Sequence, residues 1–187
     1  MVGAFHLQGS YWDRQSRRFK TDKFPISLDV TVSPWDVACM HEVIADIPGT
    51  WAGAFAALRN GTGEVLLLDG KHGNVPFALQ TAEADILTLT PLAEGPAGAL
   101  FGPLGLALML NCGGAVKAWR KEHDGFTVGL RGEGQFVAAS NNMPEGVELD
   151  GHRLERGRGW SFSEGRLQVN VPQVEGPIEH ELRVVYS

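Results

Sequence analysis

The chain has 187 residues, of which 43% are hydrophobic and 20% charged, and its net charge at pH 7 is −6. This length suits one domain with a substantial hydrophobic core, and the composition excludes wholesale disorder. The acidic balance argues against a general nucleic-acid-binding protein, which would need a basic face. We therefore expect one globular domain over residues 1–187 and no nucleic-acid partner.

Aromatic and basic side chains gather near the start of the chain. In QGSYWDR, Trp12 follows Tyr11 in a polar, glycine-containing context, where a flat indole can stack on the apolar face of a sugar. Core or rim packing is the alternative for this tryptophan. The basic residues of segment 13–23 (DRQSRRFKTDK) are interrupted by acidic ones, which favours an exposed loop over an anion-binding site.

The rest of the chain is dominated by short segments that alternate apolar and polar residues. ISLDVTV (residues 26–32) shows a period of two, and residues 51–69 form two apolar runs around Asn60-Gly61, which predicts a hairpin. Gly, Pro or Asn separates most of the other candidate strands. These are NVPFALQ, ADILTLTPL, FTVGLRG, GQFVAAS, GVELDG, GWSFSEG, GRLQVNVP and HELRVVYS, in chain order.

One segment breaks this pattern. In SPWDVACMHEVIADIPG, Ser33 can cap one short helix from Pro34 to Ala45. With 24 glycines and many short strands, the sequence predicts an all-β fold, an antiparallel Greek-key-like β-sandwich with at most one short helix.

The segment Leu100–Val116 (LFGPLGLALMLNCGGAV) is the most apolar part of the chain. A membrane span needs about 20 apolar residues, and Gly102, Pro103 and Gly105 interrupt this shorter run, so we expect no membrane partner. We predict a buried strand, a glycine turn and the start of the next strand. Gly113-Gly114 would allow positive φ or close approach of two backbones.

Residue chemistry alone identifies no catalytic or metal site. Glu42 and Asp46 share a helix face, but a solvated surface pair explains them better than a catalytic dyad. Cys39 and His41 lack a second ligand pair at metal spacing, so neither a metal nor another cofactor is expected. With two cysteines and no export leader, we expect a protein that is not secreted and works in a reducing compartment.

The five tryptophans divide into three groups. Trp51 and Trp160 are expected to pack in the core, Trp35 and Trp119 stay undecided, and Trp12 is the candidate sugar platform.

A series of motifs in one order resembles the C-terminal region of the raffinose synthase family, which includes stachyose synthase, alkaline α-galactosidases and seed imbibition proteins. FGPLGLALMLNCGGAV resembles that family's FAPIGLxxMxNSGGAV, and GAFHLQGSYW resembles GVFNCQGAGW. Three further segments have counterparts in the family, and these occur in the same order along the chain: NVPFALQTAEADILTLTPL, LRGEGQFVAASNNMP and GRLQVNVP. Cys112 in place of the family's serine, AASNN for AYSS, and the final HELRVVYS are departures that affect details of the last strands.

The resemblance implies a β-sandwich that follows a catalytic (β/α)8 barrel. The family's nucleophilic aspartate lies in a Lys-Val-Asp segment of that barrel, which is absent here, and a barrel typically needs about 250 residues. Retaining galactosyl transfer also needs two carboxylates about 5 Å apart. No catalytic residue is therefore carried over to this chain.

By this resemblance, the leading expectation is an accessory domain or fragment of a raffinose-synthase-like or alkaline α-galactosidase-like protein. The parent protein would transfer α-galactosyl groups to sucrose or hydrolyse α-galactosides. The alternative is a stand-alone carbohydrate-binding module for α-galactosides. The expected location is the cytoplasm, with the plastid as an alternative.

The resemblance also suggests partners and a weak site. The expected boundary with the barrel lies at or just before Met1, so Phe5, Leu7, Tyr11 and Trp12 would face the barrel or drive self-association. The alternative is that Phe5 and Leu7 fill the sandwich's own core. Gln8 and Trp12 are the residues expected near a sugar.

Overall fold

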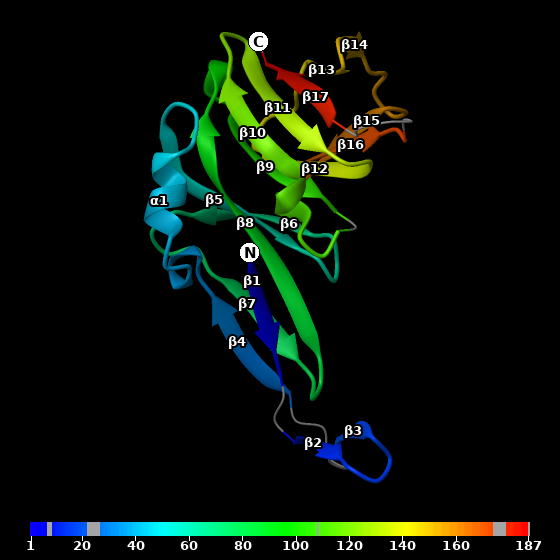
Figure 1. Ribbon diagram of the computed structural model, residues 1–187. Coiled ribbons are helices and arrows are strands. Elements are labelled where there is room, and N and C mark those ends of the chain that lie inside the picture. The colour runs from blue at the N-terminus through cyan, green and yellow to red at the C-terminus, as the bar shows by residue number, and fades with distance from the viewer. Residues whose placement is uncertain (7–8, 22–26, 108, 174–178, 187) are drawn as a thin grey trace.

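The computed structural model describes residues 1–187 except 7–8, 22–26, 108, 174–178 and 187. It is built almost entirely of antiparallel strands, so the predicted all-β sandwich is confirmed (Figure 1).

The larger sheet has eight strands. Seven follow the order β15-β16-β12-β9-β8-β5-β6, and β1 pairs with the first part of the long strand β8. Their bounds are β1 (Val2–Phe5), β5 (Trp51–Arg59), β6 (Val65–Asp69), β8 (Ala84–Glu94), β9 (Leu100–Leu106), β12 (Gly134–Ser140), β15 (Trp160–Ser163) and β16 (Arg166–Val171).

A five-stranded sheet packs against one part of the larger sheet, and two ribbons complete the fold. The five-stranded sheet follows the order β10 (Val116–Lys121), β11 (Gly125–Arg131), β17 (Glu179–Val185), β13 (Gly146–Leu149) and β14 (His152–Arg153). The ribbons are β2 (Ser10–Asp13) with β3 (Arg18–Thr21), and β4 (Leu28–Val32) with β7 (Val75–Leu79).

The main core lies between the two sheets. Phe101 of β9 and Phe126 of β11 are both fully buried and stack with ring centroids 4.8 Å apart. Burying a side chain of this size contributes about 1.5–3 kcal/mol. This aromatic pair therefore joins the two layers of the sandwich.

A second core supports a narrower part of the molecule, which we call the stalk: β1, β4, β7 and the first part of β8, with the β2–β3 hairpin at its tip (Figure 1). Val30 of β4 and Phe77 of β7 pack with Leu87 of β8 in this core. The sequence predicted β4, β7 and β8 of the stalk, but not β1, the β2–β3 hairpin or the stalk itself.

The predicted helix is divided in two. Ser33 caps the 3-10 turn η1 (Pro34–Asp36), and its Oγ accepts a hydrogen bond from Trp35 N at 3.3 Å. Val37 then adopts an extended conformation, so the α-helix α1 (Met40–Ala45) begins only three residues later. The helical part is therefore shorter than predicted.

The segment Leu100–Val116 forms a buried strand, a turn and the next strand, as predicted. The turn is the 3-10 segment η3 (Cys112–Ala115), and a further 3-10 turn, η2 (Pro96–Gly98), precedes β9. Gly105 has positive φ (106°), whereas Gly113 and Gly114 do not, because the paired glycines continue a 3-10 turn. The predicted close approach of two backbones does occur, between Gly105 and the Cys112–Gly113 peptide.

Candidate functional site

The β2–β3 hairpin carries the predicted sugar platform at the tip of the stalk (Figure 1). Trp12 is 52% exposed and contacts Phe19, itself 71% exposed, edge-to-face at 5.2 Å. Tyr11 is exposed as well. Trp12 therefore has accessible aromatic surface, but its role as a sugar neighbour stays a prediction, and Gln8 lies outside the described residues.

The hairpin loop is held by one carboxylate. Asp13 accepts hydrogen bonds from Ser16 Oγ at 2.8 Å and Gln15 N at 3.0 Å, and it forms an ion pair with Lys20. Lys20 and then Ser16 lower the pKa of this carboxyl. Arg14 and Arg17 thus lie in an exposed loop, as the sequence predicted, whereas Arg18 and Lys20 lie in β3, and Asp13 is bound to structural partners.

Phe5 lies on the surface of β1 and is 64% exposed. Its ring lies over Gly3, where a Cβ would approach Phe5 Cε2 to 2.7 Å. The alternative that Phe5 fills the sandwich core is therefore wrong, because β1 turns this side chain away from the sheet's packed face. Leu7 lies outside the described residues.

The remaining tryptophans lie in two regions. Trp160 is buried and Trp51 is half-buried, as predicted, and Trp119 packs against Phe101 and Phe126. Trp35 is 37% exposed and meets Trp51 edge-to-face at 6.2 Å. Sequence spacing did not reveal this pair, because the two residues come together through a turn near residue 70.

An open cavity of about 520 Å³ lies where the β4–β7 ribbon meets the end of β5. Arg59 stacks over Phe77 at 4.8 Å, and its guanidinium lies 3.6 Å from both Glu64 and Asp85. The two carboxylates offset the charge of Arg59, so this cavity does not form an anion site.

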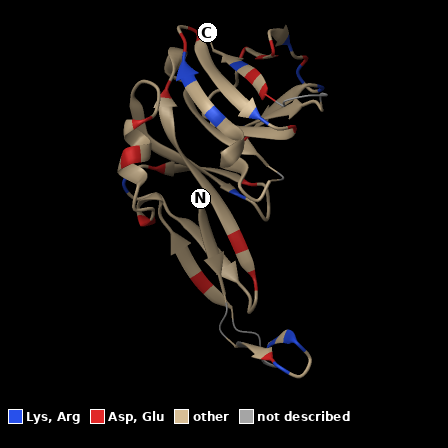
Figure 2. Cartoon of the chain, in the orientation of Figure 1, with Lys and Arg blue, Asp and Glu red and all other residues tan. Residues whose placement is uncertain are grey.

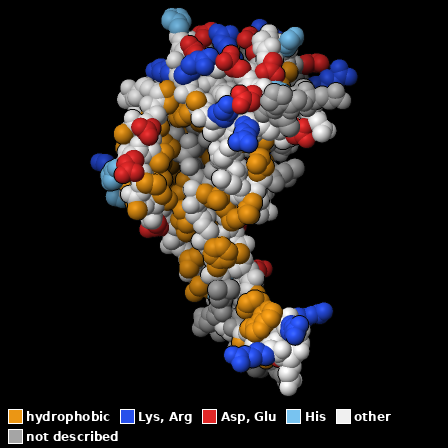
Figure 3. Space-filling view, viewed as in Figure 1, with side chains coloured by type: hydrophobic (Ala, Val, Ile, Leu, Met, Phe, Trp, Pro, Cys, Tyr) orange, Lys and Arg blue, Asp and Glu red, His pale blue; other side chains and the backbone are white. Residues whose placement is uncertain are grey.

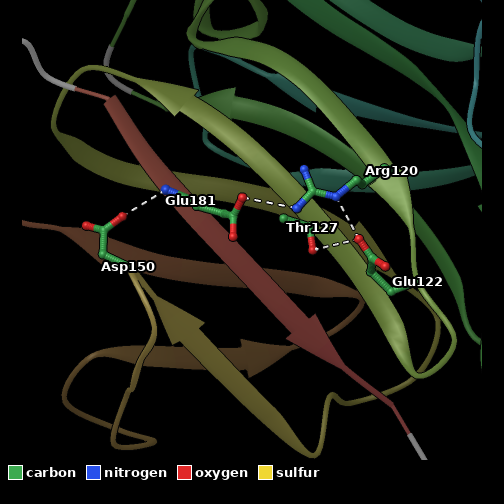
Figure 4. Close-up of polar contacts among 5 residues, drawn as sticks. All are labelled: Arg120, Glu122, Thr127, Asp150 and Glu181. Carbon is green, nitrogen blue, oxygen red and sulfur yellow. Dashed lines mark hydrogen bonds and ion pairs between the residues drawn. The ribbon is translucent and has the colours of Figure 1, made fainter.

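The outer face of the five-stranded sheet carries a charged network (Figure 4). Arg120 donates to Glu122 at 2.7 Å and to Glu181 at 3.1 Å. Glu122 also accepts from Thr127 Oγ1 at 3.4 Å, and Asp150 accepts from Glu181 N at 2.8 Å. These acidic groups are bound to basic or backbone partners, an arrangement typical of a solvated ion-pair network rather than of an acid–base pair.

The other candidates from the sequence are surface groups. Glu42 and Asp46 are exposed, and the ring of His41 lies tilted by 38° against Trp35, with ring centroids 5.0 Å apart. Among the residues that the structure describes, no three His, Cys, Asp or Glu side chains gather as a metal site. In the same part of the chain, no helix has the length and apolarity to cross a membrane.

Comparison with known proteins gives one consistent result. The profile of the family described as raffinose synthase or seed imbibition protein Sip1 matches residues 1–171. A probable galactinol–sucrose galactosyltransferase 4 of Arabidopsis thaliana is 31% identical over 96% of this chain, and that match covers 21% of the relative. The stachyose synthase of Pisum sativum is 27% identical over 94% of this chain and 20% of its own length.

The galactinol–sucrose galactosyltransferase of Oryza sativa subsp. japonica is 29% identical over 92% of this chain and 22% of its own length. The chain thus spans about a fifth of the length of these curated relatives. The family match, the colinear motifs and the β-sandwich agree, and the chain belongs to the raffinose synthase or seed imbibition protein family.

Proposed function

We propose that this chain is a C-terminal accessory β-sandwich of a raffinose-synthase-like protein and is catalytically silent by itself. The observation that carries the proposal is the match of nearly the whole chain to only about a fifth of each relative. Retaining galactosyl transfer needs two carboxylates about 5 Å apart across the sugar. The carboxylates of the charged network and of the hairpin are instead tied to structural partners.

The proposed parent reaction is transfer of an α-galactosyl group from a galactosyl donor to sucrose. The names of the Arabidopsis and rice relatives support this reaction class. Hydrolysis of α-galactosides, as in alkaline α-galactosidases, is the second candidate. The choice between sucrose and water as the acceptor is made at the catalytic centre of the barrel, so both reactions are compatible with this sandwich.

The stalk is the proposed contact surface for the catalytic barrel. Phe5, Tyr11, Trp12 and Phe19 are all exposed there. Figure 3 shows hydrophobic side chains along the stalk and on the hairpin, where Lys and Arg side chains lie as well, and a second group of charged side chains lies at the opposite end of the molecule (Figures 2 and 3). Contiguous exposed apolar surface of this kind marks protein interaction sites.

The proposed location is the cytoplasm, or alternatively the plastid. Cys39 is a free, exposed cysteine and Cys112 is free and buried, an arrangement that suits a reducing compartment.

The proposal is tested by incubating the purified chain with an aryl α-galactoside, with raffinose, and with galactinol plus sucrose. No galactose release or transfer above the buffer rate is expected. Turnover at about 1 s⁻¹ or faster that survives re-purification would refute the proposed silence.

A further inference from the structure

A second aromatic surface lies away from the stalk tip, where η1 meets the ends of β5 and β6. Trp35, Trp51, Gly53, Asp69, Gly70 and Lys71 line an open cavity of about 600 Å³. This volume falls within the range of about 300–1,000 Å³ that is typical of small-molecule sites. The hairpin with Trp12 is at the other end of the stalk from α1, which follows η1 (Figure 1).

The two indoles form a fixed corner. Their planes meet at 87° with centroids 6.2 Å apart, and both rings contact the fully buried Phe55. Trp35 Nε1 donates to Gly70 O at 2.7 Å, and Trp51 Nε1 donates to Ala54 O at 2.9 Å. Because both N–H groups are bound to the backbone, the rings are held in place and present carbon surface to the cavity.

Polar groups of opposite charge lie beside this corner. Asp69 Oδ1 accepts hydrogen bonds from the backbone N–H groups of His72 and Lys71, both at 2.9 Å. These bonds lower the pKa of Asp69, so its carboxylate is ionised at neutral pH. Lys71 also lines the cavity, so the lining residues carry no net charge and include both a hydrogen-bond acceptor and a donor.

Two glycines shape the cavity. A Cβ on Gly70 would lie 2.3 Å from Gly53 O, so the turn after β6 can cross β5 here only without a side chain. Gly53 has φ of 68°, and a Cβ there would meet no described atom within 4 Å. The space above Gly53 is therefore open, and its positive φ favours glycine.

We propose that this cavity binds a neutral saccharide. The apolar face of one hexose ring packs on the indole corner, and its hydroxyl groups bond to the Asp69 carboxylate and the Lys71 ammonium. A charge-balanced lining favours neutral sugars over anionic ones. This site is separate from the proposed barrel contact, and the inference does not depend on that contact.

Indole N–H resonances provide a site-resolved test in the full chain. The five tryptophans give five such signals in ¹H–¹⁵N spectra, each assigned by one Trp→Phe variant. Titration with raffinose should shift the Trp35 and Trp51 signals saturably, with a Kd of about 1–10 mM. Trp119 and Trp160, on the sandwich, should not respond.

Four variants separate the site from general stability. Gly53→Asn places a side chain in the open space with a residue that tolerates positive φ, and Trp35→Ala removes one wall. Each should weaken raffinose binding by about fivefold or more, whereas Met143→Ala, at an exposed side chain between β12 and β13, should not, and Trp12→Ala tests the other candidate sugar position on the hairpin. The amide spectrum of each variant shows whether it remains folded.

Three results would overturn the proposal. The first is no saturable shift at Trp35 and Trp51, and the second is a response that only Trp12→Ala removes. The third is tighter binding of galacturonate than of raffinose, which would indicate a lysine-dominated anion site. The catalytic silence of the chain is measured separately by galactose release, so failure of one proposal leaves the other testable.

Discussion

Gly105 and Cys112 approach so closely that a Cβ on Gly105 would fall 1.8 Å from the carbonyl oxygen of Cys112. This contact folds η3 back on the end of β9, and it places the Cys112 thiol 2.7 Å from Thr88 Oγ1 in a buried position. The apolar segment of residues 100–116 therefore has a structural role in the sandwich, because it holds η3 against the end of β9.

Gly105→Ala should destabilise the chain by about 3–5 kcal/mol, because it adds a clash with backbone to the strain of positive φ. Gly134→Ala is the matched control, since Gly134 also has positive φ (119°) but open space around its Cβ. Urea unfolding should show a clearly smaller loss for the control. Equal losses in the two variants would mean that the contact with Cys112 contributes nothing.

Tyr186 near the C-terminus should make stability fall at alkaline pH. Burial raises the pKa of its phenol, which a hydrogen bond to Ser140 Oγ at 2.9 Å only partly offsets. Above the unfolded pKa of about 10, the unfolded chain releases this proton and the folded chain keeps it, so stability decreases as pH rises.

Tyr186→Phe tests this origin. At pH 7 the variant should lose about 1 kcal/mol with the hydrogen bond. Between pH 9 and 11, urea unfolding should show a shallower decline for the variant than for wild type. If the stability of the variant and of wild type fell in parallel over this pH range, groups other than Tyr186 would cause the loss of stability at alkaline pH.

Asp150 should contribute stability that disappears in acid. Burial opposes ionisation, but hydrogen bonds from His180 at 2.7 Å and from Glu181 N outweigh it and lower the pKa of Asp150. The contribution is present above the unfolded pKa of about 4 and is lost as pH falls through the lower folded value.

Asp150→Asn keeps a residue that tolerates the positive φ of 52° at this position. Its stability should be lower than that of wild type at pH 6, and the difference should shrink by pH 2 to 3 in thermal unfolding. A difference that is constant with pH would exclude the carboxylate as its cause.

Exposed aromatic side chains on the stalk should cause weak self-association of the free chain. Light scattering over a concentration series should show it for wild type, and Tyr11→Ser with Trp12→Ser should relieve it. Met143→Ser, which removes an exposed apolar side chain from the loop between β12 and β13, is the control. A strictly monomeric wild type would contradict this expectation.

Local patterns predicted much of this fold because they reflect local physics. Alternation located β4, glycine located the turn after β5, and Ser33 located the start of η1. The extended Val37 that divides the helix was not predictable, since it depends on where the chain packs.

The contact between Trp35 and Trp51 could not be predicted from the sequence either, because it depends on a hydrogen bond from Trp35 to Gly70, which is 35 residues away. Trp12 was identifiable as an exposed candidate because its neighbours are polar. Trp35 lies in a segment of mixed polarity, which gave no signal of its exposure.

The most direct test of the accessory-domain account is a chimera. In the galactinol–sucrose galactosyltransferase of Oryza sativa subsp. japonica, the segment that aligns with this chain is replaced by residues 1–187, and galactosyl transfer to sucrose is measured. The chimera should be active, and Phe5→Ser with Trp12→Ser and Phe19→Ser in the same chimera should lower its activity by about tenfold or more. An inactive unsubstituted chimera, or full activity after the three substitutions, would contradict a domain that docks on the barrel through its stalk.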